Sequence, residues 1–129
     1  MKRLLLIILL FLNSAPAYAE WVAVGERDSG TTVYVDRDTI RRKGDLVKMW
    51  SLLDFKTLQT VASVSFLSSK TQWEFDCAEE RMRQLAYTWF SGNMGSGNAV
   101  HSSANEGKLE SVTPDSVGQA LWIVACGKK

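Results

Sequence analysis

A chain of 129 residues with 15 Lys and Arg against 14 Asp and Glu suits one domain with one core and carries almost no net charge. Without Lys2 and Arg3, which belong to an N-terminal segment described next, 13 basic side chains stand against 14 acidic ones. This balance excludes the strongly positive surface that attracts nucleic acid or an anionic membrane.

The first 19 residues have the pattern of a secretory signal peptide. Met1–Arg3 is basic, Leu4–Leu12 is an unbroken apolar run, and small residues at Ala17 and Ala19 mark a cleavage site. The run is much shorter than the ~20 residues that span a bilayer, and no second run follows, so we expect no transmembrane segment in the mature chain. We expect cleavage after Ala19 and export of residues 20–129 to the periplasm or the cell surface. No cysteine follows the apolar run, so we expect no lipid anchor there.

The N-terminal part of the domain predicts strands separated by polar turns. The expected elements are strands at Trp21–Val24 and Thr31–Val35, a polar turn at Gly25–Gly30, one helical turn capped by aspartates at Asp36–Ile40, and a basic turn at Arg41–Asp45. A long strand at Leu46–Phe55 and a further one at Val61–Ser69 follow.

A central hairpin is predicted between residues 72 and 91. In its first arm, Gln72–Cys77, aromatic and sulfur side chains alternate with polar ones, which is the period of a strand with one buried face. The acidic segment Asp76–Glu80 is the expected turn, and Arg81–Ser91 is the second arm. The two arms should pair antiparallel.

The long strands Leu46–Phe55 and Arg81–Ser91 are apolar on both faces. In the first of them, one face has Val47, Met49, Leu53 and Phe55, and the other has Leu46, Trp50 and Leu52. Neither strand has a polar side for solvent. Either the sheet rolls up or a second subunit covers it, so a homodimer is one expected outcome.

The C-terminal part predicts a loop, a strand and one helix. The glycine-rich segment Gly92–Asn98 is typical of a hairpin loop, and Ala99–Ser103 is the next strand. The helix should begin after Thr113 as N-cap and end near Cys126, before Gly127.

One face of this helix is apolar and should pack on the sheet. Its members are Val117, Ala120, Leu121 and Val124. The predicted fold class is therefore α+β, an antiparallel sheet with a C-terminal helix packed on it.

Cys77 and Cys126 are the two cysteines of the chain, and in an exported protein an even count favours one disulfide bond. A zinc site needs more His or Cys ligands, and a redox motif needs a C-x-x-C spacing; neither pattern occurs. In the chain-entropy model, closing a loop of about 50 residues stabilises the fold by about 4 kcal/mol. The bond would tie the turn of the central hairpin to the C-terminal helix.

No residue pattern indicates catalysis, a cofactor or a metal, so we expect a non-enzymatic protein. Gly92–Asn98 lacks the Lys-Ser/Thr pair of a phosphate loop. His101 is the only histidine, and no nucleophile accompanies it in sequence.

Two charged clusters are candidate binding surfaces. Arg41, Arg42 and Lys43 form an exposed basic turn and are the tentative contacts for an acidic or sulfated partner. The segment from Glu79 to Arg83 is either a charged binding edge or a solvated turn with weak ion pairs.

A set of ordered segments spreads over the whole mature domain. They are WVAVGE at Trp21–Glu26, VYVD at Val33–Asp36, TIRRKG at Thr39–Gly44, VKMW at Val47–Trp50, LSSKTQ at Leu67–Gln72, DC at Asp76–Cys77, ER at Glu80–Arg81, LAY at Leu85–Tyr87, WFSGNMGSG at Trp89–Gly97, and LW to ACG at Leu121–Gly127. Together they resemble the surface-adhesin protein E family of Gram-negative bacteria.

The resemblance implies an antiparallel sheet of about six strands, a C-terminal helix and a tendency to dimerise. It also implies attachment to host extracellular-matrix and plasma proteins such as laminin, vitronectin and plasminogen, as in the founding adhesin. No binding residue carries over, because no host-binding motif is matched residue by residue.

The function indicated is an exported, non-enzymatic binding module with a protein partner, and host adhesion is the first hypothesis. The alternative is a periplasmic or inhibitor-like module whose partner is another envelope protein. Neither nucleic acid nor a cofactor is an expected ligand. A concave pocket joining His101 to a carboxylate would instead favour an enzyme.

Overall fold

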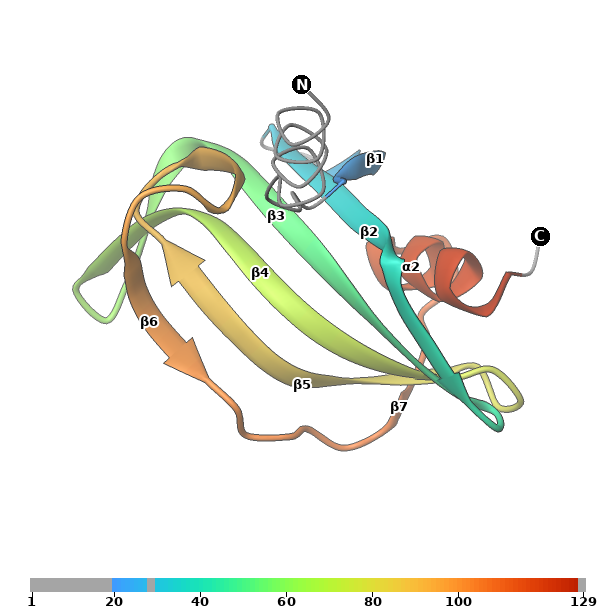
Figure 1. The fold of residues 1–129 in the computed structure, drawn as a ribbon. Coiled ribbons are helices and arrows are strands. Elements are labelled where there is room, and N and C mark those ends of the chain that lie inside the picture. Colours follow the sequence, from blue (N-terminus) through green and yellow to red (C-terminus); the bar gives the residue numbers. More distant parts are fainter. Residues whose placement is uncertain (1–19, 28–29, 128–129) are drawn as a thin grey trace, which may run out of the picture.

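The computed structural model describes residues 20–27 and 30–127, and the expected signal peptide, residues 1–19, lies outside them. In this part of the chain the strands form one antiparallel sheet with a C-terminal helix on it, as predicted (Figure 1). The strands are β1 Val22–Arg27, β2 Thr31–Lys43, β3 Leu46–Val61, β4 Val64–Asp76, β5 Arg81–Phe90, β6 Ala99–Ser103 and β7 Glu110–Ser111. The helices are the short η1 Asn93–Gly95 and α2 Val117–Cys126.

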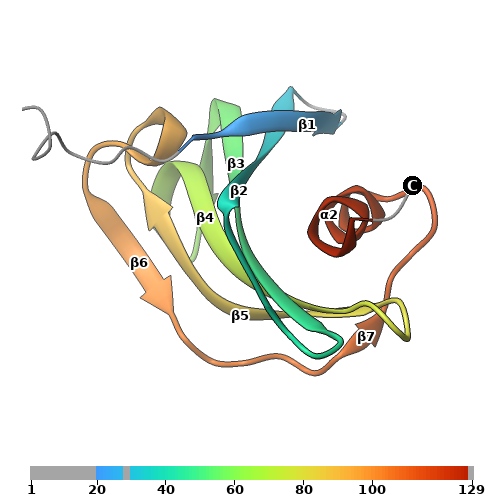
Figure 2. The ribbon, with the colours of Figure 1, turned by 45° about the vertical axis from the view of Figure 1, so that its right-hand side comes forward.

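The sheet is a meander that curls around the helix. β1 to β6 lie in chain order, so each strand pairs with its sequence neighbour, and β7 pairs with β5. The pairing shifts between residues 36 and 41 of β2, 54 and 59 of β3, and 72 and 73 of β4. Irregularities of this kind bend a strand and increase its twist. The sheet therefore has a concave face, which holds α2, and a convex face (Figure 2).

The main core lies between α2 and the concave face. Val47 and Met49 of β3 and Phe75 of β4 are completely buried there. From the helix, Leu121 and Trp122 join the same cluster. Because these side chains leave water together, their burial holds the helix on the sheet.

The concave apolar face of the long strands is covered within one chain, and the convex face is covered in part. The concave face is covered by α2, and part of the convex face is covered by the loop Gly92–Asn98. Ser68 on β4 donates a hydrogen bond from Oγ to the Gly92 oxygen over 2.7 Å and accepts one from the Gly95 nitrogen over 2.8 Å. The loop thus lies over the fully buried Leu52. The expectation that the sheet rolls up is met, and the homodimer stays a prediction.

The helical turn expected at Asp36–Ile40 is wrong, because these residues belong to β2. The Asp36 carboxylate accepts a hydrogen bond from the Asp38 nitrogen over 3.0 Å. Aspartates can make such a local bond at a helix start as well, which is why the sequence favoured a helical turn. Thr39 instead directs its hydroxyl across the sheet, where Oγ1 accepts from the Trp50 nitrogen over 3.0 Å. The segment is an irregular part of the strand, held by β3.

The expected strand boundaries were also too narrow. The strands predicted at Val61–Ser69 and Gln72–Cys77 are joined in one continuous strand, β4, which begins at Val64, because Val61 ends β3, and stops at Asp76, before Cys77. The polar run of Ser68 to Gln72 hid this continuity, because buried hydroxyls on a strand look like loop residues in sequence.

The helix begins later than predicted. Ser116, not Thr113, is the N-cap: its Oγ accepts from the Gln119 nitrogen over 3.1 Å and donates to the Thr113 oxygen over 2.6 Å. Asp115 has φ 58°, a left-handed conformation that a helix cannot include. The end is as predicted, since Gly127 is the left-handed C-cap with φ 69°.

The buried face of α2 is also rotated from the predicted one. Leu121 is buried as expected, whereas Val117 and Val124 pack only at the margin of the core. The buried residues of the helix are Leu121, Trp122, Ala125 and Cys126. Trp122 makes the difference, because its large ring fills the space between the helix and the β4–β5 turn.

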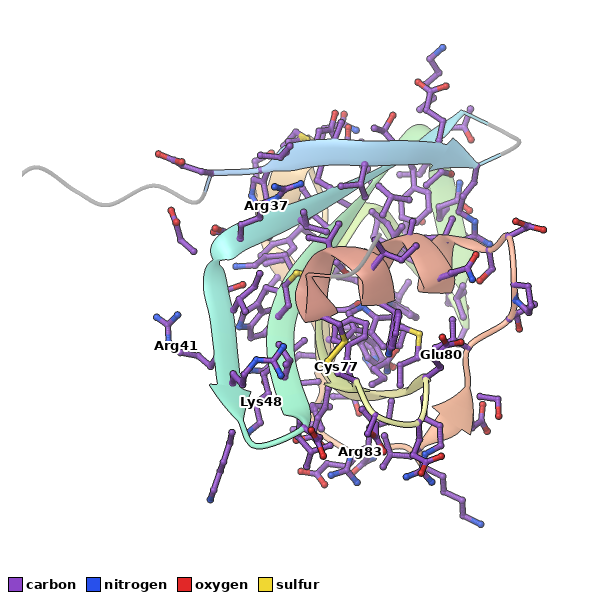
Figure 3. All side chains as sticks on the ribbon, turned by 90° about the vertical axis from the view of Figure 1, so that its right-hand side faces the viewer. Arg37, Arg41, Lys48, Cys77, Glu80 and Arg83 are labelled. Carbon is purple, nitrogen blue, oxygen red and sulfur yellow. A yellow bond between two sulfur atoms is a disulfide. The ribbon has the colours of Figure 1, made fainter. Side chains whose placement is uncertain are left out.

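The predicted disulfide is confirmed. Cys77, at the start of the β4–β5 turn, is bonded to Cys126, the last residue of α2, with the two Cα atoms 5.6 Å apart. Figure 3 shows Cys77 next to the helix. The bond therefore fixes the C-terminal end of α2 to the sheet.

Candidate functional site

A row of charged side chains crosses four strands on the convex face. Arg41 of β2 is opposite Lys48 of β3, Lys48 is opposite Glu74 of β4, and Glu74 is opposite Arg83 of β5. Lys48 alternates with Val47 and Met49, which point into the core, so this row faces away from the helix.

A second row lies beside the first, nearer the hairpin turns. It consists of Lys43, Leu46, Asp76 and Arg81, again one residue from each of β2 to β5. Leu46 is 37% exposed, so this end of the face is not purely polar.

Both carboxylates of these rows are already paired. Glu74 Oε1 accepts from Arg83 Nε over 2.9 Å and lies 2.7 Å from Arg83 Nη2. Asp76 Oδ2 lies 2.7 Å from Arg81 Nη2. Both acidic side chains are only 9% exposed, which makes them poor partners for further cations.

Three positive charges are left over: Arg41, Lys43 and Lys48, all exposed. Among the residues that the structure describes, no carboxylate lies within 4.0 Å of their charged nitrogens. We call these three residues the basic ladder. Figure 3 shows Arg41 extending from β2 away from the helix. A cationic, partly apolar patch of this kind can bind an acidic surface.

The predicted site residues Arg41, Arg42 and Lys43 are not one cluster on one face. They end β2, and the turn is Gly44-Asp45. Arg42 is opposite Val47, and its Nη2 lies 4.0 Å from Cys77 Sγ. It therefore belongs to the concave side. All three residues still meet at the hairpin end, where a depression of about 550 Å³ is lined by them together with Leu46, Lys48 and Glu74.

Sequence reasoning missed Lys48. The signal was present, because a two-residue turn at Gly44-Asp45 sets Lys43 opposite Leu46 and Arg41 opposite Lys48. Without a firm turn position that register was not fixed.

The charged segment from Glu79 to Arg83 is divided between the β4–β5 turn and the start of β5, where Arg81 and Arg83 form ion pairs. Arg81 holds the pKa of Asp76 below its ordinary value, and the Glu79 and Ala78 backbone N–H groups act in the same direction against burial. Glu79 and Glu80 are exposed.

His101 belongs to an aromatic cluster with two residues of β5. It is an exposed residue of β6 whose Nε2 lies 3.1 Å from the Tyr87 hydroxyl oxygen, and its ring lies 4.6 Å from that of Trp89. Within the described residues no group of three or more His, Cys, Asp or Glu side chains is arranged to hold a metal ion.

A separate cleft of about 780 Å³ lies on the concave face, beside the first half of α2. Its lining includes Ser51 and Thr71 from the central strands, Trp73 and Met82, and the segment from Gly107 to Thr113. His101 is not part of it. Across the described ranges, no helix is both long and apolar enough to cross a membrane.

Several solved structures of one bacterial protein have the same fold. Crystal form II of Haemophilus influenzae protein E matches with a TM-score of 0.67 and 14% sequence identity, over 87% of this chain and 91% of that chain. Another structure of Haemophilus influenzae protein E matches with a TM-score of 0.61 and 16% identity, over 85% and 87% of the two chains. A comparison with curated protein sequences finds no match.

The family comparison covers almost the entire described domain. The model of the family described as surface-adhesin protein E matches residues 21–127, which contain the whole sheet, the disulfide and α2. The resemblance carried by the ordered sequence segments and the likeness in fold agree with this match. The chain belongs to the surface-adhesin protein E family.

Proposed function

We propose that this domain is a non-enzymatic binding module that attaches to an acidic surface of another protein through its basic ladder. The observation that carries the proposal is the set of unpaired charges on Arg41, Lys43 and Lys48, beside carboxylates that Arg81 and Arg83 already occupy. Membership of a surface-adhesin family supports an adhesive role.

The pairing of the neighbouring acids makes the ladder available to a partner. If Glu74 and Asp76 were free, they would neutralise the nearby lysines. Because each is bonded to an arginine, an incoming carboxylate or sulfate meets net positive charge. Such complementarity raises association rates and selects partners more than it adds affinity.

Host extracellular-matrix and plasma proteins are the partners that we propose first. Laminin, vitronectin and plasminogen are the test proteins, because the family resemblance implies them. The expected export of residues 20–129 and the disulfide agree with a function outside the cytoplasm.

The first experiment asks where the domain is. Protease is added to intact cells and to cells with an opened outer membrane, with a periplasmic protein as control. Digestion on intact cells supports direct host attachment. Digestion only after opening contradicts it, and an envelope protein then takes the place of the host partner.

The second experiment tests the surface. We expect the double variant Lys43→Glu/Lys48→Glu to associate with immobilised laminin or vitronectin at least about tenfold more slowly than the unaltered domain at low salt. The difference should shrink in high salt, where exposed charges are screened. Lys56→Glu, which lies nearer the other end of β3, makes the same charge change as Lys48→Glu alone and is the matched control for that single variant. Equal effects of the two changes would contradict the assignment of the basic ladder.

A further inference from the structure

We propose that the cleft between α2 and the concave face binds a short extended peptide that combines a large apolar side chain with an acidic residue. The cleft has a volume of about 780 Å³, within the usual range of specific ligand sites. It lies on the face opposite the basic ladder, so binding there does not depend on Lys43 or Lys48.

The floor of the cleft offers two hydroxyl donors. Ser51 of β3 and Thr71 of β4 are directly opposite each other, and they are only 3% and 6% exposed. Ser51 Oγ accepts a hydrogen bond from Trp73 Nε1 over 2.9 Å, which leaves its own proton for another acceptor. Among the described residues, Thr71 Oγ1 has no hydrogen-bond partner, although Thr71 lines the cleft. In the part of the chain that the structure describes, Arg81 Nε is the one fully enclosed side-chain polar atom without a partner, so the Thr71 hydroxyl is open to the cleft and can donate to a ligand oxygen there.

Part of the wall of the cleft is apolar. Its apolar side chains are Leu53, Trp73, Met82, Val112, Val117 and Leu121. These side chains come from the sheet, from the segment before α2 and from α2 itself, so they can enclose one large aliphatic or aromatic group. Burying such a group is worth about 1.5–3 kcal/mol for a side chain the size of Leu or Phe, a general value for removal from water.

The lining also includes exposed cations. Arg27 and Lys108 line the cleft and are exposed. The lining has one exposed acidic residue, Glu110. Arg83, which also borders the cleft, is bonded to Glu74. The unpaired charges of the lining therefore favour an acidic ligand group.

A peptide satisfies all of these features at once. A backbone carbonyl can accept from Ser51 and Thr71, an apolar side chain can contact Trp73 and Met82, and an adjacent carboxylate can approach Lys108. A fatty acid has only one polar end. If its carboxylate lies at the cations, the two hydroxyls have no ligand acceptor, and if the carboxylate lies at the hydroxyls, the alkyl chain lies beside the cations.

The test titrates the purified domain, residues 20–129, with acetyl-Leu-Leu-Asp-Asp-amide. The readouts are the dissociation constant and the NMR signal of the Trp73 indole N–H. The comparison ligands are acetyl-Leu-Leu-Asn-Asn-amide and dodecanoate. We expect the acidic peptide to bind with a dissociation constant below about 1 mM and to shift the Trp73 signal. It should bind more tightly than the amide peptide.

Three variants locate the site. Thr71→Val removes a hydroxyl that bonds no described protein group, so the fold is kept and affinity should fall about fivefold. Gly118→Leu should abolish binding, because even its Cβ would lie 3.1 Å from Met82 Sδ and the rest of the side chain would take up space in the cleft. Its thermal unfolding is measured alongside, to show that the variant folds. Lys108→Gln should weaken the acidic peptide and leave the amide peptide unchanged, with Lys43→Gln as the matched control.

The proposal is overturned by any of three results. One is the absence of binding by the acidic peptide at about 1 mM. Another is undiminished binding by Gly118→Leu. The third is tighter binding of dodecanoate than of the peptide, which would make the cleft a site for an amphiphile instead.

Discussion

Trp122 Nε1 donates a hydrogen bond to the backbone oxygen of Asp76 over 3.0 Å, joining α2 to the last residue of β4. Cys126 lies one helical turn beyond Trp122, and its disulfide partner Cys77 directly follows Asp76. A hydrogen bond and a covalent bond thus connect the same two segments on successive turns of the helix.

The hydrogen bond of Trp122 can be tested separately from its bulk. Trp122→Phe keeps an aromatic ring but leaves the Asp76 oxygen without this donor, and we expect a loss of about 1–3 kcal/mol in the free energy of unfolding. Trp122→Ala should cost about 3–5 kcal/mol, because it also leaves a cavity. Urea denaturation measures both. Equal stability of Trp122→Phe and the unaltered domain would show that the hydrogen bond contributes nothing.

The disulfide should act mainly on the unfolded chain. We expect Cys77→Ser/Cys126→Ser to lower the free energy of unfolding by about 4 kcal/mol and to keep the far-UV spectrum of the sheet. The reduced, unaltered domain is the control and should behave like the double variant. Loss of the sheet signal in the variant would mean that the bond is needed for the fold itself.

Asp76 should make stability depend on acid. Its pKa is below the ordinary 3.8, first because of Arg81 and also because of two backbone N–H groups, so the folded state favours the charged carboxylate. The contribution of Asp76 to the free energy of unfolding is therefore fully present above pH 3.8 and is lost as the pH falls through the lowered pKa. Asp76→Asn should be less stable than the unaltered domain at pH 7, with the difference closing in strong acid. A constant difference over that range would contradict the assignment.

Elements that are marked by nearby residues or by a simple count could be predicted from the sequence. The β4–β5 turn, β6, the disulfide and the stop at Gly127 depend on turn residues, alternation and cysteine count, which are all local or countable. The start of α2 could not be fixed, because Thr113 and Ser116 are both residues that cap helices. Only the left-handed backbone of Asp115 decides between them.

The candidate site was harder to predict for the same kind of reason. Arg41, Arg42 and Lys43 are contiguous in sequence, and that contiguity concealed their separation onto two faces of a strand. The basic ladder is defined by register with β3, and its availability depends on which arginines pair with Glu74 and Asp76. The register and the ion pairs both depend on tertiary structure, so no local sequence pattern predicts them.

Self-association stays a prediction. We now expect the dimer interface at an edge of the sheet and not on one of its faces. β1 is an edge strand of the described sheet, and its Val22 is 46% exposed. Unpaired strand edges favour pairing with another chain, so we expect a dimer joined along β1.

Sedimentation velocity over a range of concentrations tests this dimer. Val22→Lys should shift it to the monomer, whereas Val61→Lys, at a similarly exposed valine in the β3–β4 hairpin, should not. A monomer at every concentration of the unaltered domain would refute it.

The chain-order meander has a consequence for assembly. Each pairing from β1 to β6 joins sequence neighbours, so hairpins can form one after another as the chain emerges from its N-terminal end. α2 differs, because it packs against β1 to β4 and its disulfide partner lies 49 positions earlier. Until those last residues arrive, Val47, Met49 and Phe75 face water on an open sheet. A nascent or truncated chain ending before residue 117 would therefore be a substrate for chaperones and quality-control proteases, while the completed chain would escape them.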